Sequence, residues 1–227
     1  MIFHDILDMI YPNYCLGCNA QLAGNSEVLC MDCAEELPYT HFFDKEENPV
    51  KEIFYGRITV AHAGSALFYT KGSLVQRLLF ALKYQGNKNA GLFLGALLAQ
   101  QLAETRWIQE IDCIVPLPLH KKRERKRGYN QSAVIGSKLS EMLAIPMNTD
   151  MVERAVYTET QTHKTREARW QSMQTVFKIK DENALQSKHI LLIDDVLTTG
   201  ATMEVCGNEI LKVKDTKLSI ATAAFAI

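Results

Sequence analysis

Two adjacent carboxylates follow an apolar run near the C-terminal end of the chain. Residues 189–193, "HILLI", suit a buried strand, and Asp194 and Asp195 come directly after them. Carboxylates only accept hydrogen bonds, which suits them to a pair of vicinal hydroxyl groups or to a ligand that carries Mg²⁺. A strand end followed by an ordinary helix cap would use the same residue types, so the two acids alone do not decide their role.

A threonine-rich turn that ends in glycine follows the two acids and precedes an expected helix. The start of a helix offers unpaired backbone N–H groups and the positive end of its dipole, so it binds anions. The combination predicts a pocket for a ribose 5-phosphate, with the diol on the aspartates and the phosphate on the turn. The G-K-[ST] of a Walker A loop is not present. The expected turn residues are Leu197, Thr198, Thr199, Gly200, Ala201 and Thr202.

A strongly basic segment follows a second apolar run, "IDCIVPLPL" at residues 111–119. Its six cations and one acid give a local charge of +5 in a chain of net charge -1. Such a segment can hold a pyrophosphate group or follow a nucleic-acid backbone, and a merely solvated charged loop is the alternative. Ligands bind where the strands of a parallel sheet end, which favours a functional loop here. The cations are Lys121, Lys122, Arg123, Arg125, Lys126 and Arg127, and the acid is Glu124.

A polar segment, "ERAVYTETQTHKTREARWQS", lies between two expected strands at residues 151–156 and 175–179. Long hairpins of this kind often act as lids over a ligand. His163 could act there as an acid or base, or it could be an exposed loop histidine. Trp170 and Tyr129 could stack on a base or could pack against the domain. The sequence therefore predicts a lid and leaves the roles of these three side chains open.

Four cysteines near the N-terminus form two C-x2-C pairs, which are Cys15 with Cys18 and Cys30 with Cys33. Two thiolates on each of two tight turns can complete a tetrahedral zinc site with no position left for water, which indicates a structural role. A disulfide pair is disfavoured in a reducing compartment, and redox chemistry would not need two copies of the motif. The segment is too small to bury a core, so the metal would supply its folding energy.

The composition bounds the class of protein. With 227 residues, 47% hydrophobic and 22% charged, the chain suits one good-sized globular domain and a small appendage. No apolar run approaches the roughly 18 residues of a membrane span. Residues 1–12 lack the basic start of a signal peptide and suit a short amphipathic helix, so a cytoplasmic location is expected. Cys113 and Cys206 lie in apolar surroundings and are expected in the core.

Strands that alternate with helices must position these groups. A linker is expected at residues 41–52, between an N-terminal part at 1–40 and a larger domain at 53–227. The alternation predicts a parallel α/β sheet covered on both faces, with the candidate sites at the carboxyl ends of its strands. Strands are expected in 57–69 (two short strands around Gly64), 111–119, 151–156, 175–179, 189–193 and 217–227, and helices in 73–84, 90–105, 130–144 and 201–213.

The order of these pieces resembles the ComF family, with its GntX-like group, along nearly the whole chain. The matching segments are "IYPNYCLGC", "CMDCAEELP", "LLFALKYQG", "VPLPLHKKRERKRGYNQS" and "ILLIDDVLTTGAT". The resemblance implies a type I phosphoribosyltransferase-like parallel sheet flanked by helices, with a small N-terminal zinc-ribbon module. It also implies a role in natural competence, which is the handling of incoming single-stranded DNA on the cytoplasmic side of the DNA-uptake machinery.

The resemblance also implies site residues and ligands. Asp194, Asp195 and residues 197–202 would bind phosphoribosyl pyrophosphate (PRPP) together with Mg²⁺, and the zinc would be structural. The pyrophosphate or DNA-backbone side would comprise Lys83, His120, Arg123, Arg125, Arg127 and Asn130. The lid would comprise Arg154, Thr158, Gln161 and Arg169, although Ser172 stands where the family has Asn.

Two functions from different classes remain open at this point. One is an enzyme that transfers a phosphoribosyl group from Mg-PRPP to an unidentified base or amine and releases pyrophosphate. The other is a binding protein that keeps the PRPP-type fold and handles single-stranded DNA, with DNA-uptake proteins as further partners. The association of the family with competence favours the second, because a fold by itself does not settle a function.

Overall fold

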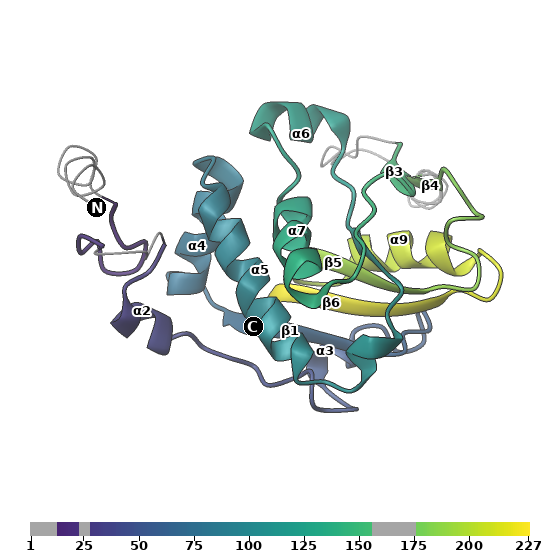
Figure 1. The fold of residues 1–227 in the computed structure, drawn as a ribbon, viewed down its shortest axis with the longest axis horizontal. Helices are drawn as coiled ribbons and strands as arrows, with labels where there is room; N and C mark the ends of the chain where they lie inside the picture. The colour runs from purple at the N-terminus through teal and green to yellow at the C-terminus, as the bar shows by residue number, and fades with distance from the viewer. Residues whose placement is uncertain (1–12, 23–27, 156–175) are drawn as a thin grey trace, which may run out of the picture.

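Four parallel strands form the central sheet of the protein (Figure 1). The computed structural model describes residues 13–22, 28–155 and 176–227, so the helix expected in residues 1–12 lies outside the described residues. The strand order is β1-β6-β5-β2, and all three pairings are parallel, which confirms the predicted parallel sheet. The strands are β1 (Ala63–Tyr69), β2 (Cys113–Pro116), β5 (His189–Leu197) and β6 (Lys217–Ala226).

Strand β1 differs from the prediction of two short strands in residues 57–69. It runs unbroken through Gly64. The ring of Phe43 packs where a side chain at position 64 would lie, which explains why this position is a glycine. A Cβ atom there would come within 2.4 Å of Phe43 Cδ1. The glycine therefore marks a close approach in the middle of a strand rather than a turn.

Helices cover both faces of the sheet, as the alternating pattern predicts. In β5, Leu191 and Ile193 face one apolar core and Ile190 and Leu192 face the other. The first face packs against α4 (Leu74–Tyr84), α5 (Lys88–Ala103) and α7 (Gln131–Leu143), and the second against α3 (Pro49–Glu52) and α9 (Ala201–Leu211) (Figure 1). The remaining helical elements are α2 (Met31–Glu35), η1 (Trp107–Glu110) and α6 (Lys121–Arg127).

A separate antiparallel pair, β3 (Val152–Arg154) with β4 (Phe177–Ile179), confirms the two strands expected beside the lid segment. The segment between them, residues 156–175, lies outside the described residues. Cys113 and Cys206 are buried among apolar side chains, as expected. In the described part of the chain, every helix is too short or too polar to pass through a lipid bilayer.

The segment expected as a linker is packed against the sheet. Three apolar side chains of this segment are buried, those of Phe42, Phe43 and Val50. Just before the segment, the Tyr39–Leu67 bridge places residue 39 antiparallel beside β1. Asn48, which is 3% exposed, connects this segment to the sheet. Its amide donates to the carbonyl oxygens of residues 42, 45 and 63, and its Oδ1 accepts the N–H groups of residues 50 and 51. The boundaries at 40 and 52 stay predictions.

We expect Asn48→Ala to destabilise the protein by about 2–4 kcal/mol, because it removes five hydrogen bonds and leaves buried backbone groups unpaired. The matched control is Asn87→Ala, since Asn87 also caps a helix but accepts a single cap bond, from the Ala90 N–H. We expect the control to cost about 1 kcal/mol. Urea denaturation of both variants measures the difference, and equal losses would contradict the role given to Asn48.

Candidate functional site

Strand β5 continues through both aspartates, which corrects the expectation that they follow the strand. In the sheet, Asp194 lies opposite Thr222 of β6, and Leu197 lies opposite Phe225. The long neighbour β6 supplies partners for these positions, so Leu197 ends the strand instead of opening the turn. The two carboxylates therefore belong to the rigid sheet, and only residues 198–200 connect β5 to α9.

Asp194 faces the start of α7. Its Oδ1 accepts hydrogen bonds from the Ser132 hydroxyl at 2.7 Å and from the Asp195 N–H at 2.8 Å. Burial, and then the neighbouring Asp195 carboxylate, raise the pKa of Asp194 to about 7, although the Ser132 hydrogen bond and the Lys83 ammonium oppose this shift. Asp194 therefore exchanges its proton near neutral pH. Sequence reasoning missed Ser132, because its closeness to β5 arises only in the fold.

Asp195 faces the end of α4 and is buried. Its Oδ1 lies 2.8 Å from Lys83 Nζ, in an ion pair whose two side chains are 7% and 20% exposed. Lys83 was expected on the pyrophosphate side, and in the structure its ammonium group forms an ion pair with Asp195. Among the described residues, no hydrogen bond or ion pair reaches Oδ2 of either aspartate. These oxygens are the natural contact points for a diol.

The turn after β5 is held by residues 53–57, the segment that follows α3. Gly200 has φ +74°, and a Cβ atom there would come within 2.6 Å of Ile53 Cγ2 and 3.1 Å of Phe54 Cε1, so this position needs glycine. Arg57 Nη1 lies 3.3 Å from the carbonyl oxygen of Thr199 and 3.4 Å from Glu204 Oε2.

This turn leads directly into helix α9. Within the described part of the chain, no side chain caps the start of α9 at Gly200. The expected turn residues Thr198, Thr199, Ala201 and Thr202 are exposed. An uncapped helix start beside exposed hydroxyls suits an anion.

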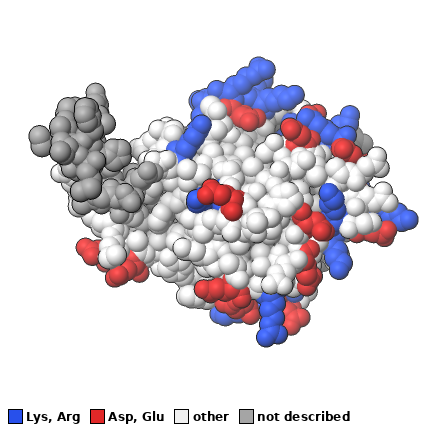
Figure 2. Space-filling model, viewed as in Figure 1, with Lys and Arg blue, Asp and Glu red and all other residues white. Residues whose placement is uncertain are grey.

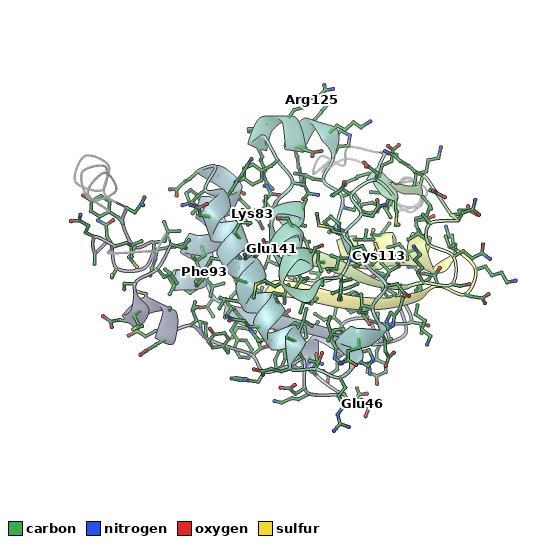
Figure 3. All side chains as sticks on the ribbon, in the orientation of Figure 1. Glu46, Lys83, Phe93, Cys113, Arg125 and Glu141 are labelled. Atoms are coloured by element: carbon green, nitrogen blue, oxygen red, sulfur yellow. The ribbon has the colours of Figure 1, made fainter. Side chains whose placement is uncertain are left out.

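The basic segment is a helix, α6, rather than the expected loop. The His120 ring caps its start, because Nδ1 accepts the Lys122 N–H at 3.1 Å, and Gly128 ends it in the left-handed conformation. Burial and the nearby cations, Arg154 foremost, lower the pKa of His120, which keeps Nδ1 an acceptor. Figure 2 shows the basic side chains gathered over α6, and Arg125 points away from the body of the protein in Figure 3.

Asn130 connects the end of the β2 segment to α7. Its Nδ2 donates to the Leu117 carbonyl oxygen at 3.0 Å, and its Oδ1 caps α7 by accepting the Ser132 N–H at 3.1 Å. Asn130 therefore positions Ser132 for Asp194. Tyr129, whose role the sequence left open, packs against the domain: its hydroxyl donates to the Leu82 carbonyl oxygen, and Lys88 lies over its ring.

Arg154 is the one lid residue that the described structure places near the acids. Burial and Arg123 lower the pKa of Arg154, while the charge of Asp194 raises it. Arg154, Asn130 and Lys121 line a cleft of about 270 Å³ between α6 and the β3–β4 pair. The other expected lid residues, Thr158, Gln161 and Arg169, lie outside the described residues, as do His163, Trp170 and Ser172.

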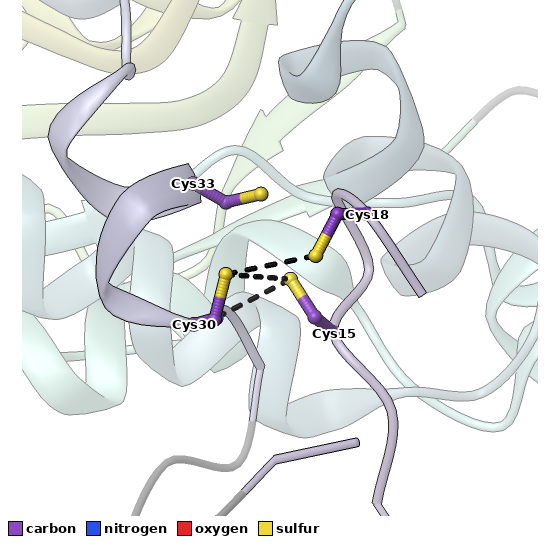
Figure 4. Close-up of side chains that lie close together, drawn as sticks. All are labelled: Cys15, Cys18, Cys30 and Cys33. Carbon is purple, nitrogen blue, oxygen red and sulfur yellow. Dashed lines mark hydrogen bonds between the residues drawn. The ribbon is translucent and has the colours of Figure 1, made fainter. Parts of the chain in front are cut away.

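The four cysteines of the two pairs come together at one point (Figure 4). Their sulfur atoms all lie within 4.8 Å of one another, and Cys30 Sγ is 3.7 Å from Cys15 Sγ and 3.6 Å from Cys18 Sγ. A tetrahedral zinc site with Zn–S bonds of about 2.3 Å has S–S edges of about 3.8 Å. The cluster therefore fits a metal such as zinc, which Cys15, Cys18, Cys30 and Cys33 would hold in a structural role.

The local backbone prepares these thiols for a cation. Burial raises the pKa of Cys15, but the backbone N–H groups of Cys18, Cys30 and Gly17 outweigh it and lower that pKa to about 6. Burial and the three neighbouring thiols raise the pKa of Cys33 to about 12. Four thiolates at these distances repel one another, so full ionisation requires a bound cation.

Gly17 allows the two cysteine pairs to approach each other. The cysteine spacing alone did not predict this role. A Cβ atom at position 17 would lie 2.5 Å from Cys33 Sγ. Next to it, Arg77 Nε of α4 donates to the Leu16 carbonyl oxygen at 3.1 Å. Cys15 and Cys33 also belong to the apolar core that α4 and α5 share. The cysteine module thus rests on the same helix that supplies Lys83.

A family model described as "Phosphoribosyl transferase domain" matches residues 89–226, more than half of the chain. The chain belongs to this phosphoribosyltransferase family. Its match runs from α5 to β6, so it includes the two aspartates, the turn and α6. The predicted fold class, a parallel phosphoribosyltransferase-type sheet with an N-terminal cysteine module, is confirmed.

Two relatives carry the resemblance further. The chain is 28% identical over 201 residues to competence protein F of Haemophilus influenzae, with 87% of this chain and 82% of that protein covered. It is 30% identical over 129 residues to DNA utilization protein YhgH of Salmonella typhimurium, and this match spans 56% of each chain, about half of that relative's length. The predicted resemblance to the ComF family is confirmed.

Among solved structures, the phosphoribosyltransferase-family chain is similar to glutamine PRPP amidotransferase from B. subtilis complexed with ADP and GMP. The TM-score is 0.43 at 18% identity, and the similarity covers 60% of this chain and 26% of that one.

We expect Asp194→Asn to stabilise the protein above pH 7. The pKa of Asp194 is about 7 in the fold against an ordinary 3.8, so its favourable contribution is complete below about pH 4 and is lost as the pH rises to 7. An asparagine stays neutral, and its Oδ1 still accepts from Ser132. The gain at pH 8 should be about 1–2 kcal/mol, or roughly 2–8 °C in Tm, and should vanish at pH 4.

The matched control for this pH effect is Asp195→Asn, which breaks the ion pair with Lys83 and should lower Tm at pH 8. Melting curves at pH 4, 6 and 8 compare the two variants with the unmodified protein. A loss of stability in Asp194→Asn at pH 8 would contradict the raised pKa assigned to this carboxyl group.

For the cysteine module, we expect about one Zn²⁺ per chain, and Cys30→Ser should abolish it. Gly17→Ala should also reduce the zinc content, because its methyl group would displace the Cys33 sulfur. Cys113→Ser removes a buried thiol outside the module and should keep the metal. Metal analysis tests the zinc content, and limited proteolysis of Cys30→Ser should show new cleavage sites only before about residue 40; new sites mainly beyond residue 40 would contradict a role of the metal confined to the module.

Proposed function

We propose that this protein binds PRPP with Mg²⁺ at Asp194, Asp195 and residues 197–202, and that it handles incoming single-stranded DNA in natural competence, on the cytoplasmic side of the DNA-uptake machinery. The observation that carries the ligand proposal is that Lys83 of α4 pairs with one of two sheet-bound acids, in the strand that leads to the start of α9. The competence role is supported by the names of the relatives, competence protein F and DNA utilization protein YhgH.

The ribose and phosphate contacts follow from the chemistry of these groups. Oδ2 of each aspartate would accept a ribose hydroxyl, and the N–H groups at the start of α9, with the hydroxyls of Thr198 and Thr202, would bind the 5-phosphate. Mg²⁺ would supply charge compensation for the pyrophosphate. His120, Arg123 and Asn130 would lie on the pyrophosphate side, and Arg154 would approach it from the lid.

The charges of Asp194, Asp195 and Lys83 support the binding of a ligand that brings a diol and a cation. Without ligand, Lys83 holds Asp195, and Asp194 is partly protonated near pH 7. A bound diol and cation would stabilise both carboxylates in their ionised form and would compete with Lys83 for Asp195. Lys83 would then become available to the pyrophosphate group, which is the role that the family resemblance implies for it.

The DNA proposal is supported by α6, where six cations and one acid lie on an exposed helix in a chain of net charge -1. A small basic site of this kind predicts weak, strongly salt-dependent binding to a phosphate backbone. The proposed location is the cytoplasm, because a reducing compartment keeps the four thiols available for zinc. DNA-uptake proteins are the proposed protein partners.

A second candidate function is an active phosphoribosyltransferase that moves a phosphoribosyl group from Mg-PRPP to an unidentified base or amine. The observation that favours it is Asp194, because a carboxyl group with a pKa of about 7 can accept or release a proton during turnover at neutral pH. The cleft of about 270 Å³ beside Arg154 offers space for an acceptor.

Calorimetric titration with PRPP and Mg²⁺, repeated with single-stranded DNA in the cell, tests the proposal. We expect binding that Asp194→Asn with Asp195→Asn abolishes, while melting curves verify the fold. The control is Asp215→Asn, an exposed aspartate in the turn before β6, where asparagine tolerates the positive φ of 57°. Retained affinity in the double variant would contradict the ribose assignment.

The same titration separates the two candidate functions. A change in PRPP affinity in the presence of DNA would support the binding protein, because linked sites alter each other's affinity by the same factor. Pyrophosphate release on addition of nucleobases would support the enzyme instead. Absence of PRPP binding to the unmodified protein would refute the ligand proposal for both.

A further inference from the structure

Two aromatic side chains stand exposed on α4, away from the core that this helix helps to form. Phe80 is 50% and Tyr84 66% exposed, and their ring centroids lie 5.1 Å apart. Residues four apart share one helix face, so the two rings form a pair on the solvent side. The opposite face of α4 already fills the core with Val75, Leu78, Leu79 and Leu82. Exposed paired rings contribute little to folding and suit an external ligand.

A groove between α4 and the cysteine module begins at this pair. It has a volume of about 590 Å³, within the range of ligand sites, and Phe80 and Arg77 line one wall while Tyr14 and Leu16 line the other. Tyr14 is 52% exposed, so a third aromatic ring faces the groove. Gln76 and Gln85 add amide groups to the same lining. The groove thus combines ring faces with hydrogen-bonding groups.

An arginine lies at each end of the Phe80–Tyr84 pair. Arg77 is fixed at the groove by its hydrogen bond to the Leu16 carbonyl oxygen, which leaves its positive charge uncompensated by that contact. At the other end, the Arg127 guanidinium lies 5.4 Å over the Tyr84 ring. Arg127 is the last residue of α6, so the aromatic pair leads directly to the basic helix. Groove, rings and α6 form one continuous track.

The chemistry of this track identifies its occupant. Ring faces offer stacking to unpaired bases of any sequence, and interleaved arginines hold the phosphates, which is the pattern of sites for single strands. A duplex hides the faces of its bases inside the helix, so it cannot use these rings. An apolar protein partner would gain from Phe80 and Tyr84 but not from Arg77 and the +5 charge of α6.

We propose that the groove and the exposed rings of Tyr14, Phe80 and Tyr84 form a stacking site for single-stranded nucleic acid, which continues onto α6. This inference rests on the proposed DNA function and adds its location and its mode of binding. On α4, Lys83 lies between Phe80 and Tyr84 in sequence and reaches Asp195, so the same helix carries the stacking pair and a contact to the proposed PRPP site.

The test measures binding of a fluorescent single-stranded oligonucleotide to Phe80→Ala with Tyr84→Ala. Both side chains are at least half exposed, so the double variant should keep its melting temperature. We expect its affinity to fall at least about tenfold, since stacking on each ring is lost. The matched control is Tyr55→Ala, which removes a 62% exposed tyrosine that hydrogen-bonds to Glu47 away from the track and should leave affinity unchanged.

A second readout distinguishes stacking from charge attraction. An oligonucleotide that carries 2-aminopurine should change its fluorescence on binding to the unmodified protein, and this change should be lost in the double variant. An abasic strand of the same length should bind equally weakly to both, because only phosphate contacts remain. Arg125→Ala with Lys126→Ala on α6 should instead reduce the salt dependence and retain the 2-aminopurine signal.

The outcomes separate this inference from the function on which it rests. If the unmodified protein binds no single strand, the DNA function fails, and this site fails with it. If it binds single strands and the double variant binds equally well, only the stacking site is refuted. If the double variant keeps its affinity for DNA but loses a self-association seen by sedimentation, the rings are a protein contact, which also overturns the inference.

Discussion

Two adjacent carboxylates in one strand, Asp195 buried and Asp194 half-buried, are the constraint on which the site depends. Asp194 and Asp195 are fixed in β5; Lys83 forms an ion pair with Asp195, while the charges of Lys83 and Arg154 also act on Asp194. The remaining charge is lessened by a proton on Asp194, whose pKa is raised to about 7, and by the Ser132 hydroxyl. Such an arrangement costs stability in the absence of a ligand, and proteins keep it where a ligand completes the charge balance.

Helix α4 connects the parts that surround this pair. In its first half, Arg77 donates a hydrogen bond to the Leu16 carbonyl oxygen of the cysteine module. In its last turn, Lys83 forms the ion pair with Asp195. The cysteine module and Asp195 are therefore both contacted by side chains of the same helix. The module is small, and four thiols within 4.8 Å of one another require a cation to be stable as thiolates.

Much of the architecture could be predicted from the sequence because the apolar periods are clear. Strand β5 and helices α4, α5, α7 and α9 follow such periods, and the four cysteines follow the spacing that zinc requires. The basic segment was expected as a loop because of its charge. Its cap by His120 and its end at Gly128 are sequence signals that could have identified α6, as Asn48 before Pro49 could have identified α3.

Other features depend on contacts between distant segments, which no local pattern contains. Ser132 meets Asp194 only because α7 packs beside β5. Gly17 and Gly64 look like turn residues, yet each makes room for a side chain from another segment, Cys33 and Phe43. The position of Arg57 beside Thr199 likewise joins segments 142 residues apart. Burial, charge and close approach in three dimensions decide these positions, while the sequence shows only the residue types.

The strand order has a consequence for how the protein is made. The last strand in the sequence, β6, lies inside the sheet, hydrogen-bonded to β1 on one side and to β5 on the other. During translation, β1 has no partner in the described sheet until the ten residues of β6 have left the ribosome. Until then the edge of β1 that pairs with β6 presents unpaired backbone N–H and C=O groups, because the bridge to residue 39 lies on its other edge. The cysteine module, whose ligands all lie before residue 34, is synthesised long before that moment and can bind its metal while the sheet is still incomplete.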